Sequence, residues 1–223
     1  MTRRMIVPLV FGIVGAAILA GLGTWQVQRL EWKKAILAEI SAKIATDPIA
    51  IPENPEPDLL NYHAATASGR LDGPEIHVLT GRKREGPGFR VIRALTMADG
   101  RRVLADLGFV AEAGKGTARA ATDVTIVGNL IWPDETDGFT PAPNLDRNIW
   151  FARDTDKMAA HLQTEPVMIA ARARTSYDDI IPMPVTVNIP NDHLEYAITW
   201  FSLMVIWIGM TAFLLWRIKR ADD

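Results

Sequence analysis

The 223-residue chain contains no cysteine. Without thiolates it cannot form a disulfide, a thiolate-ligated zinc or iron–sulfur site, a covalently attached c-type haem or a cysteine nucleophile. A copper chaperone is also disfavoured, because thiolate is the preferred ligand of Cu(I). The absence does not identify the compartment, since reducing and oxidising spaces both tolerate cysteine-free proteins.

Charge is missing from two long stretches, residues 5–28 and residues 196–216. At about 1.5 Å per residue, a helix of either length exceeds the roughly 30 Å hydrocarbon core of a bilayer. Each stretch is therefore predicted to cross a membrane once, and the lack of a third such run excludes a many-span transporter. Gly12, Gly15 and Gly23 lie in the first stretch, and small residues of this kind let a partner helix approach closely. Frequent glycine is also simply common in membrane helices.

A cleaved signal peptide is the alternative interpretation of the first run, because Arg3 and Arg4 precede an apolar centre. The run is long for a signal, and its helical pattern continues without a break through Trp25 to Trp32. These features favour an uncleaved anchor.

Basic residues near the second span predict the orientation. Arg217, Lys219 and Arg220 follow this span, whereas the fifteen residues before it hold no lysine or arginine. The positive-inside rule then places the C-terminus, and with two spans both termini, in the cytoplasm. The region between the spans would face the periplasm of a bacterium, at its plasma (inner) membrane, or the intermembrane space from a mitochondrial inner membrane.

The predicted organisation is a tail (1–4), a first span (5–28), an exported domain (29–195), a second span (196–216) and a second tail (217–223). The tails hold five basic and two acidic residues, so that the net charge of −2 leaves −5 for the region between them.

Within the exported region, alternating apolar patterns predict strands at 62–71, 75–82, 89–97, 102–110, 123–132 and 166–174. Asp99-Gly100 predicts a two-residue hairpin turn between the third and fourth of these. Asp154 is expected to cap a helix over 155–162. The helix that leaves the membrane should end at Ile44 or Ala45, and the four prolines at 48–57 favour an extended spacer outside the core. The fold class is an α+β membrane protein: two transmembrane helices flank a mostly antiparallel, barrel-like β domain with one accessory helix.

No catalytic signature is present: the chain lacks G-x-S-x-G, H-E-x-x-H, a P-loop and G-x-G-x-x-G. An enzyme is therefore not expected. His63 and His77 lie on the first two predicted strands and could hold a metal if those strands pair. The simpler interpretation is that both face solvent.

His193 lies where the second span begins, between a potential capping residue, Asp192, and Glu195. Tyr196 and Trp200 follow it on the same helix face. An imidazole beside aromatic groups at the membrane interface can serve as an axial haem ligand. A purely structural histidine that caps the helix is the alternative.

Residues 23–33, GTWQVQRLEWK, resemble the G-x-W-Q-x-x-R-x-x-W-K signature of the surfeit locus protein one (Shy-type) family of cytochrome c oxidase assembly factors. Residues 191–200, NDHLEYAITW, resemble the family's second signature, N-x-H-L-x-Y-A-x-T-W. Further similarities are residues 139–144 (FTPAPN), Gly69, Trp150, Asp154 and Met158-Ala159. The chain departs from the family pattern within residues 105–109. Where the family usually has N-R-G-W, this chain has Asp106-Leu107-Gly108-Phe109.

The resemblance implies an assembly chaperone of respiratory chain biogenesis that binds haem a and assists its insertion into oxidase subunit I. Partners would be subunit I, other oxidase assembly or haem a synthesis proteins, and membrane lipid, with no nucleic acid. By position, His193 becomes the haem iron ligand. Trp25, Trp200 and Tyr196 would contact the macrocycle, and Arg29 would pair with a propionate. Arg29 could instead form a cation–π clasp with Trp25 and Trp32. A scaffold that stabilises subunit I without binding haem is the alternative function.

Overall fold

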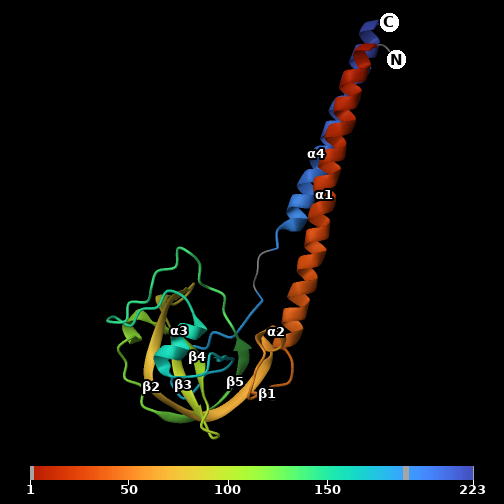
Figure 1. Ribbon diagram of the computed structural model, residues 1–223. Helices are drawn as coiled ribbons and strands as arrows, with labels where there is room; N and C mark the ends of the chain where they lie inside the picture. Colours follow the sequence, from red (N-terminus) through yellow and green to blue (C-terminus); the bar gives the residue numbers. More distant parts are fainter. Residues whose placement is uncertain (1–2, 188–190, 223) are drawn as a thin grey trace. The chain divides into compact units, whose positions relative to one another are not determined.

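The computed structural model describes residues 3–187 and 191–222, which form two compact units (Figure 1). The helical unit comprises Met1–Glu39 and Asn188–Asp223, and the sheet unit comprises Ile40–Val187. Residues 1 and 2 of the predicted first tail and residue 223 of the second lie outside the described residues.

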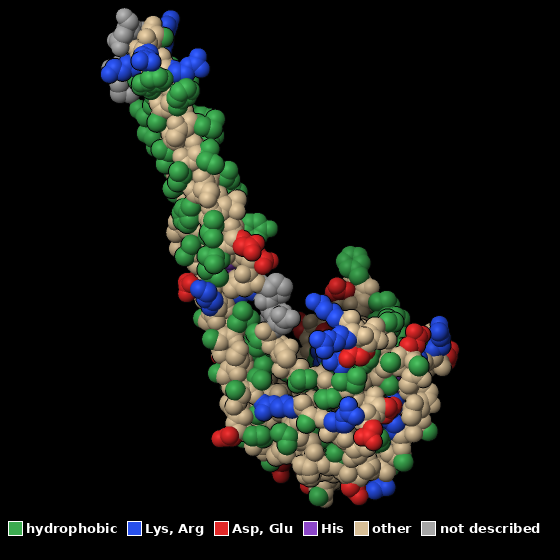
Figure 2. All heavy atoms as spheres, turned by 180° about the vertical axis from the view of Figure 1, so that it is seen from behind, with side chains coloured by type: hydrophobic (Ala, Val, Ile, Leu, Met, Phe, Trp, Pro, Cys, Tyr) green, Lys and Arg blue, Asp and Glu red, His purple; other side chains and the backbone are tan. Residues whose placement is uncertain are grey.

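The helical unit consists of two long apolar helices that run side by side (Figure 1). Helix α1 spans Arg3–Ile44, of which the portion up to Glu39 belongs to this unit, and α4 spans His193–Asp222. Both are long and apolar enough to cross a membrane by length and composition. Figure 2 shows hydrophobic side chains along their surface and Lys and Arg side chains at the end that carries the termini. This distribution suits helices surrounded by lipid.

The two helices approach each other closely at glycines of α1. A Cβ atom at Gly12 would lie 2.2 Å from Thr211, one at Gly15 would lie 2.4 Å from the indole of Trp207, and one at Gly23 would lie 2.7 Å from Phe201. The Trp207 indole Nε1 also donates a hydrogen bond to the Gly12 carbonyl at 3.0 Å. The glycines therefore form a packing face for α4, as small residues do between membrane helices.

The sheet unit is built on six strands: β1 (Ile49–Ala50), β2 (Ala64–Arg82), β3 (Gly86–Met97), β4 (Arg102–Ala111), β5 (Thr122–Ile131) and β6 (Met168–Ala171). Their order is β1-β2-β3-β4-β6-β5, and β2 additionally pairs with β5, so the pairings that leave β2 through β3 return to β2 through β5. The β1–β2 and β4–β6 pairings are parallel and the other four are antiparallel. The sheet is thus mixed and not antiparallel throughout, because neither β1 and β2 nor β4 and β6 are joined by a hairpin.

Strand β2 unites two predicted strands. The residues between these two predicted strands form a bulge, at which the register with β3 shifts between Asp72 and Glu75. Gly73 adopts a φ of +67°, which glycine tolerates without strain. The first half of β2 pairs with β5 and the second half with β3 alone. The bulge bends this long strand, so that its first half can pair with β5 while its second half pairs with β3.

The β3–β4 hairpin forms where it was predicted, although its turn differs. The Met97 amide donates to the Arg101 carbonyl at 2.8 Å, and the Gly100 amide donates to the Met97 carbonyl at 3.0 Å. Only Gly100, with a φ of +86°, is left-handed in this turn. The connection is therefore a three-residue loop that ends in a left-handed glycine, and not the expected two-residue turn.

Three short helical elements complete the unit: α2 (Pro57–Leu60), η1 (Glu112–Gly114) and α3 (Thr155–Leu162). Helix α3 is confirmed with its cap, since the Asp154 carboxylate accepts a hydrogen bond from the Lys157 amide at 3.0 Å. The expected spacer at residues 48–57 is wrong as a description of the whole segment. It contains β1 and the start of α2, and Ile51 is buried in the core.

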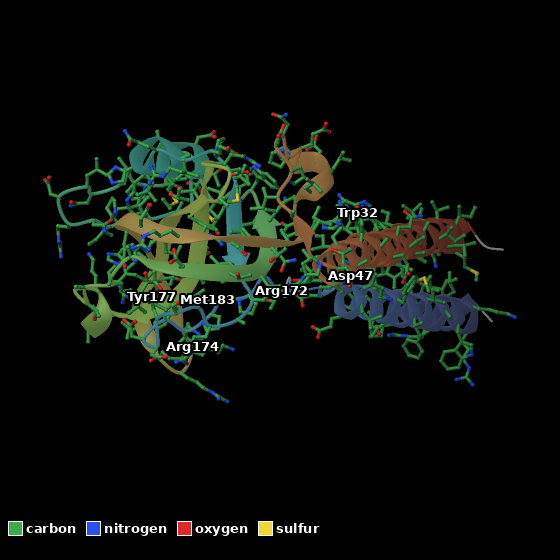
Figure 3. All side chains as sticks on the ribbon, turned by 90° about the horizontal axis from the view of Figure 1, so that it is seen from below. Trp32, Asp47, Arg172, Arg174, Tyr177 and Met183 are labelled. Carbon is green, nitrogen blue, oxygen red and sulfur yellow. The ribbon has the colours of Figure 1, made fainter. Side chains whose placement is uncertain are left out.

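The last turn of α1 is anchored within the sheet unit. The carbonyl oxygen of Ile44 accepts hydrogen bonds from Asn129 Nδ2, at 3.3 Å, and from the guanidinium of Arg172, which Figure 3 labels. Arg172 Nε donates to Asn129 Oδ1 at 2.9 Å. A cation at this position satisfies a free helix carbonyl and opposes the negative end of the helix dipole.

Candidate functional site

The first residue of α4, His193, contacts Gln26 of α1. Imidazole Nδ1 lies 2.7 Å from amide Oε1 of Gln26, whose side chain is 8% exposed. An amide oxygen only accepts hydrogen bonds, so Nδ1 carries the proton in the neutral ring. The lone pair is then on Nε2. This is the arrangement that second-shell acceptors impose on metal-ligating histidines.

The predicted aromatic residues of α4 divide between two environments. Ala197, one turn after His193, is buried, and Trp200 is half-buried. Tyr196 is 56% exposed. The start of α4 therefore combines an inward face that packs on the neighbouring helix with an accessible phenol ring beside it.

On α1, Arg29 lies between two indoles. Its guanidinium carbon is 5.8 Å from the ring centroid of Trp25 and 5.1 Å from that of Trp32. Both indoles are about half exposed. The cation–π clasp predicted from the spacing is present, and it keeps the Arg29 side chain along the helix surface. The pairing of Arg29 with a propionate stays a prediction.

The other two histidines of interest have separate partners. His63 Nδ1 lies 3.0 Å from the Ala64 carbonyl and 3.3 Å from the Thr46 hydroxyl. His77 is 6% exposed, so the expectation that it faces solvent is wrong. Its Nε2 lies 3.1 Å from Glu75. Among the described residues, no group of three or more His, Asp or Glu side chains could hold a metal ion.

Glu75 belongs to a buried charge network that sequence reasoning missed. Arg119, almost fully buried, contacts Glu75 at 2.7 Å and Asp179 at 2.5 Å. Arg93 donates to the hydroxyl of Tyr177 at 2.5 Å. Burial raises the pKa of Tyr177 above its usual value. The residues come from distant parts of the chain, and nothing in their local sequence indicates that they meet.

The departure at residues 105–109 also receives a structural explanation. Asp106, buried, accepts from Arg90 at 2.5 Å and from Arg153 at 3.2 Å. Leu107 and Phe109 are fully buried in the core. In this chain the segment is thus held by an internal ion-pair network and apolar packing.

Residues 139–144 form part of an ordered loop that exposes an aromatic ring. The Asp137 carboxylate accepts hydrogen bonds from the Phe139 amide and the Thr140 hydroxyl, both at 2.9 Å. These bonds lower the pKa of Asp137, the Phe139 amide having the largest effect. The Phe139 side chain is 93% exposed. Trp150 and Met158, by contrast, are buried and have structural roles.

Comparison with known proteins agrees with the resemblance of the two signatures. The SURF1 family model matches residues 13–205. A SURF1-like protein of Monosiga brevicollis is 31% identical over 87% of this chain and 82% of its own length. Surfeit locus protein 1 of Rattus norvegicus is 29% identical over 82% and 67% of the two chains. A SURF1-like protein of Rickettsia felis is 28% identical over 86% and 90%. The chain belongs to the SURF1 family, known in general as cytochrome oxidase assembly factors.

Proposed function

We propose that this protein is a cytochrome c oxidase assembly factor that binds haem a at the membrane interface and assists its insertion into oxidase subunit I. Family membership supports the assembly role. The observation that supports haem binding is the contact between Gln26 and His193, because in the neutral ring it favours the tautomer whose Nε2 lone pair is free, at the start of an apolar helix.

The available donor set suits a haem better than a bare metal ion. One neutral imidazole is a sufficient axial ligand for haem iron, whereas a protein-bound metal ion needs several ligands. Trp25, next to Gln26 in sequence, and Tyr196, three residues after His193, both expose about half of their surface. Haem a supplies the redox-active iron of the finished oxidase, and here it is the cargo.

Each residue of the proposed site has a distinct task. His193 would hold the cargo through Nε2, and Gln26 would fix the ring orientation and tautomer from the other side. Trp25, Trp200 and Tyr196 would provide apolar contact. Arg29 forms cation–π contacts with two indoles on the surface of α1. From this position its guanidinium would be able to pair with a haem propionate. A single ligand from the protein suits a carrier, since one coordinate bond must break for release.

The proposed topology follows from the charge distribution. Both termini would be cytoplasmic, and the sheet unit would lie in the periplasm, or in the intermembrane space of a mitochondrion. In this topology His193 and Gln26 would lie at the outer surface of the membrane. Partners would include subunit I, other oxidase assembly or haem a synthesis proteins, and the surrounding lipid.

Absorption spectroscopy tests this proposal. The full chain is purified in detergent from cells that make haem a, together with His193→Ala and the control His161→Ala, which alters a histidine of α3. We expect a haem a spectrum in the wild type and the control, and its loss in His193→Ala. An unchanged spectrum in His193→Ala would contradict the ligand assignment. Absence of haem from the wild type, with continued co-purification of oxidase subunit I, would instead support the scaffold function.

A further inference from the structure

An apolar groove runs between α1 and α4. Its wall on α1 is formed by Gly15, Ile18 and Leu19, and its wall on α4 by Leu203, Ile206, Trp207 and Met210. Its volume is about 420 Å³. The Trp207 indole packs against Gly15 between the two helices and lines the groove. The residues that line it in the described part of the chain are all uncharged.

The groove lies on the same face of α1 as two residues of the proposed haem site. Starting from the lining residues, one face continues along the helix at spacings of three, four, three and four residues: Gly15, Ile18, Leu22, Trp25 and Arg29. Residues at these spacings stay on one side of an α-helix. The α1 wall of the groove thus leads directly to Trp25 and Arg29.

The corresponding wall of α4 leads to the other side of the site. The same spacings run back along α4 from the groove residues Met210, Ile206 and Leu203 to Thr199 and Tyr196, which lie outside the groove on the same helix face. Tyr196 lies three residues after His193. At about 1.5 Å per residue, Leu203 is roughly 15 Å and Met210 roughly 25 Å from His193 along the helix axis. The groove therefore begins below the proposed haem site and extends into the apolar part of the helices.

We propose that this groove receives the farnesyl tail of haem a, and that the protein thereby distinguishes farnesylated haems from haem b. The proposal depends on the proposed function, in which His193 holds the iron. A ring held at His193 and packed beside Tyr196 would direct a long, branched apolar substituent along the two walls. Inside a membrane such a tail gains nothing from leaving water, so its binding depends on van der Waals contact. The Trp207 indole and the leucine and isoleucine side chains that line the groove provide that contact.

Filling the groove tests the proposal. Leu203→Trp and Ile18→Trp would each place an indole in the space for the tail. The controls Val205→Trp and Ile13→Trp add the same bulk to exposed positions on other faces of the same helices. Binding of haem a, haem o and haem b is titrated spectroscopically against the purified full chain. Haem o shares the farnesyl tail, and haem b lacks it.

We expect the wild type to bind haem a and haem o about tenfold more tightly than haem b, a difference of about 1.4 kcal/mol. The groove variants should lose this preference and keep their affinity for haem b, and the controls should keep both. Equal wild-type affinities for the three haems would overturn the proposal, as would a groove variant that weakens haem b as strongly as haem a. Binding that persists unchanged in His193→Ala would overturn the ligand assignment instead.

A haem-free measurement separates the tail from ordinary lipid. Farnesol or oleic acid is added to the protein in nanodiscs, and the methyl NMR signal of Met210 is followed, with Met204 as an internal reference outside the groove. Farnesol should shift the Met210 signal in the wild type and not in Leu203→Trp. An equal shift with oleic acid would show a general acyl-chain groove and overturn the assignment to an isoprenoid. No shift with farnesol would overturn it as well.

Discussion

The amide oxygen of Gln26 accepts a hydrogen bond from Nδ1 of His193 at 2.7 Å, and this contact joins the two family signatures across 167 positions of sequence. It links the α1 signature to the only histidine of the second signature. A change at Gln26 should therefore alter the state of His193 without removing the ring.

Gln26→Leu is expected to let the neutral imidazole of His193 adopt either tautomer. Long-range ¹⁵N–¹H NMR of the haem-free protein should show His193 protonated on Nδ1 in the wild type and a mixture of tautomers in the variant. Loss of such a second-shell partner typically weakens metal binding about 10–100-fold. The control Gln28→Leu changes an exposed neighbour and should leave both observations unchanged. Gln26→Glu keeps an acceptor and should keep the tautomer; a mixture in that variant would count against the argument.

Asn129→Ala should destabilise the sheet unit. Asn129 is fully buried, and its Nδ2 donates to the carbonyls of Tyr62 and Ile44 at 2.7 and 3.3 Å. The substitution leaves the Tyr62 carbonyl and Arg172 Nε without this partner, and loss of such a partner inside a protein costs about 1–3 kcal/mol. Chemical denaturation of the full chain in detergent, followed by near-UV circular dichroism, would measure the loss. The matched control Arg70→Ala removes an exposed pair with Asp123 and should change stability by less than about 1 kcal/mol. Equal effects would refute the burial argument.

Gly108→Ala should disrupt β4. Gly108 has a φ of +119°, and a Cβ atom there would lie 2.3 Å from the Ile181 carbonyl oxygen. Backbone strain and overpacking together should cost roughly 2–4 kcal/mol. Gly116→Ala is the control, because no atom within 4 Å would meet its Cβ and its φ is not positive. Yield of folded protein and its melting temperature would show the difference. A Gly108→Ala protein as stable as Gly116→Ala would contradict the strained geometry.

Acid should weaken the contact between Glu135 and Arg153. Partial burial acts to raise the pKa of Glu135, but the hydrogen bonds and charge of Arg153 outweigh this, so the pKa lies below its ordinary value. A depressed carboxylate pKa stabilises the fold above the unfolded-state pKa of about 4.3, and the contribution is lost as pH falls through the folded-state value. Because Glu135 is partly exposed, the contribution should be below about 1 kcal/mol.

Melting temperatures of the wild type and Glu135→Gln, measured between neutral and acidic pH, would check this prediction. The wild type should be more stable at neutral pH, and the two curves should converge only as the pH falls below about 4. A difference that grows toward acid pH would have the wrong sign and would reject the assignment.

Elements encoded by local patterns could be predicted from sequence. Charge-free runs are sufficient to identify helices such as α4, and the Asp154 cap marks the start of α3. Elements that depend on distant partners could not be predicted. The pairing of β2 with β5, the mixed character of the sheet and the burial of Ile51 all require tertiary contacts that no local spacing encodes.

The candidate site shows the same division. The Arg29 clasp follows from helical spacing and is confirmed. The Gln26 contact could not be predicted, although Gln26 stands in the first signature, because helical spacing alone does not give the register between two spans. The burial of His77 was missed because its partners, Glu75 and Asn148, include one from a distant loop.

The close approach of α4 to Gly12, Gly15 and Gly23 also bears on biogenesis. In the proposed topology, the two spans would enter the membrane at different moments of synthesis, because the whole sheet unit must be translocated between them. They must then find each other by lateral diffusion and settle into one register. A bulkier residue at any of these glycines would slow that encounter, and unpaired spans are substrates for membrane quality control. Such variants should reduce the amount of protein in the cell, while each molecule that does pair keeps its function.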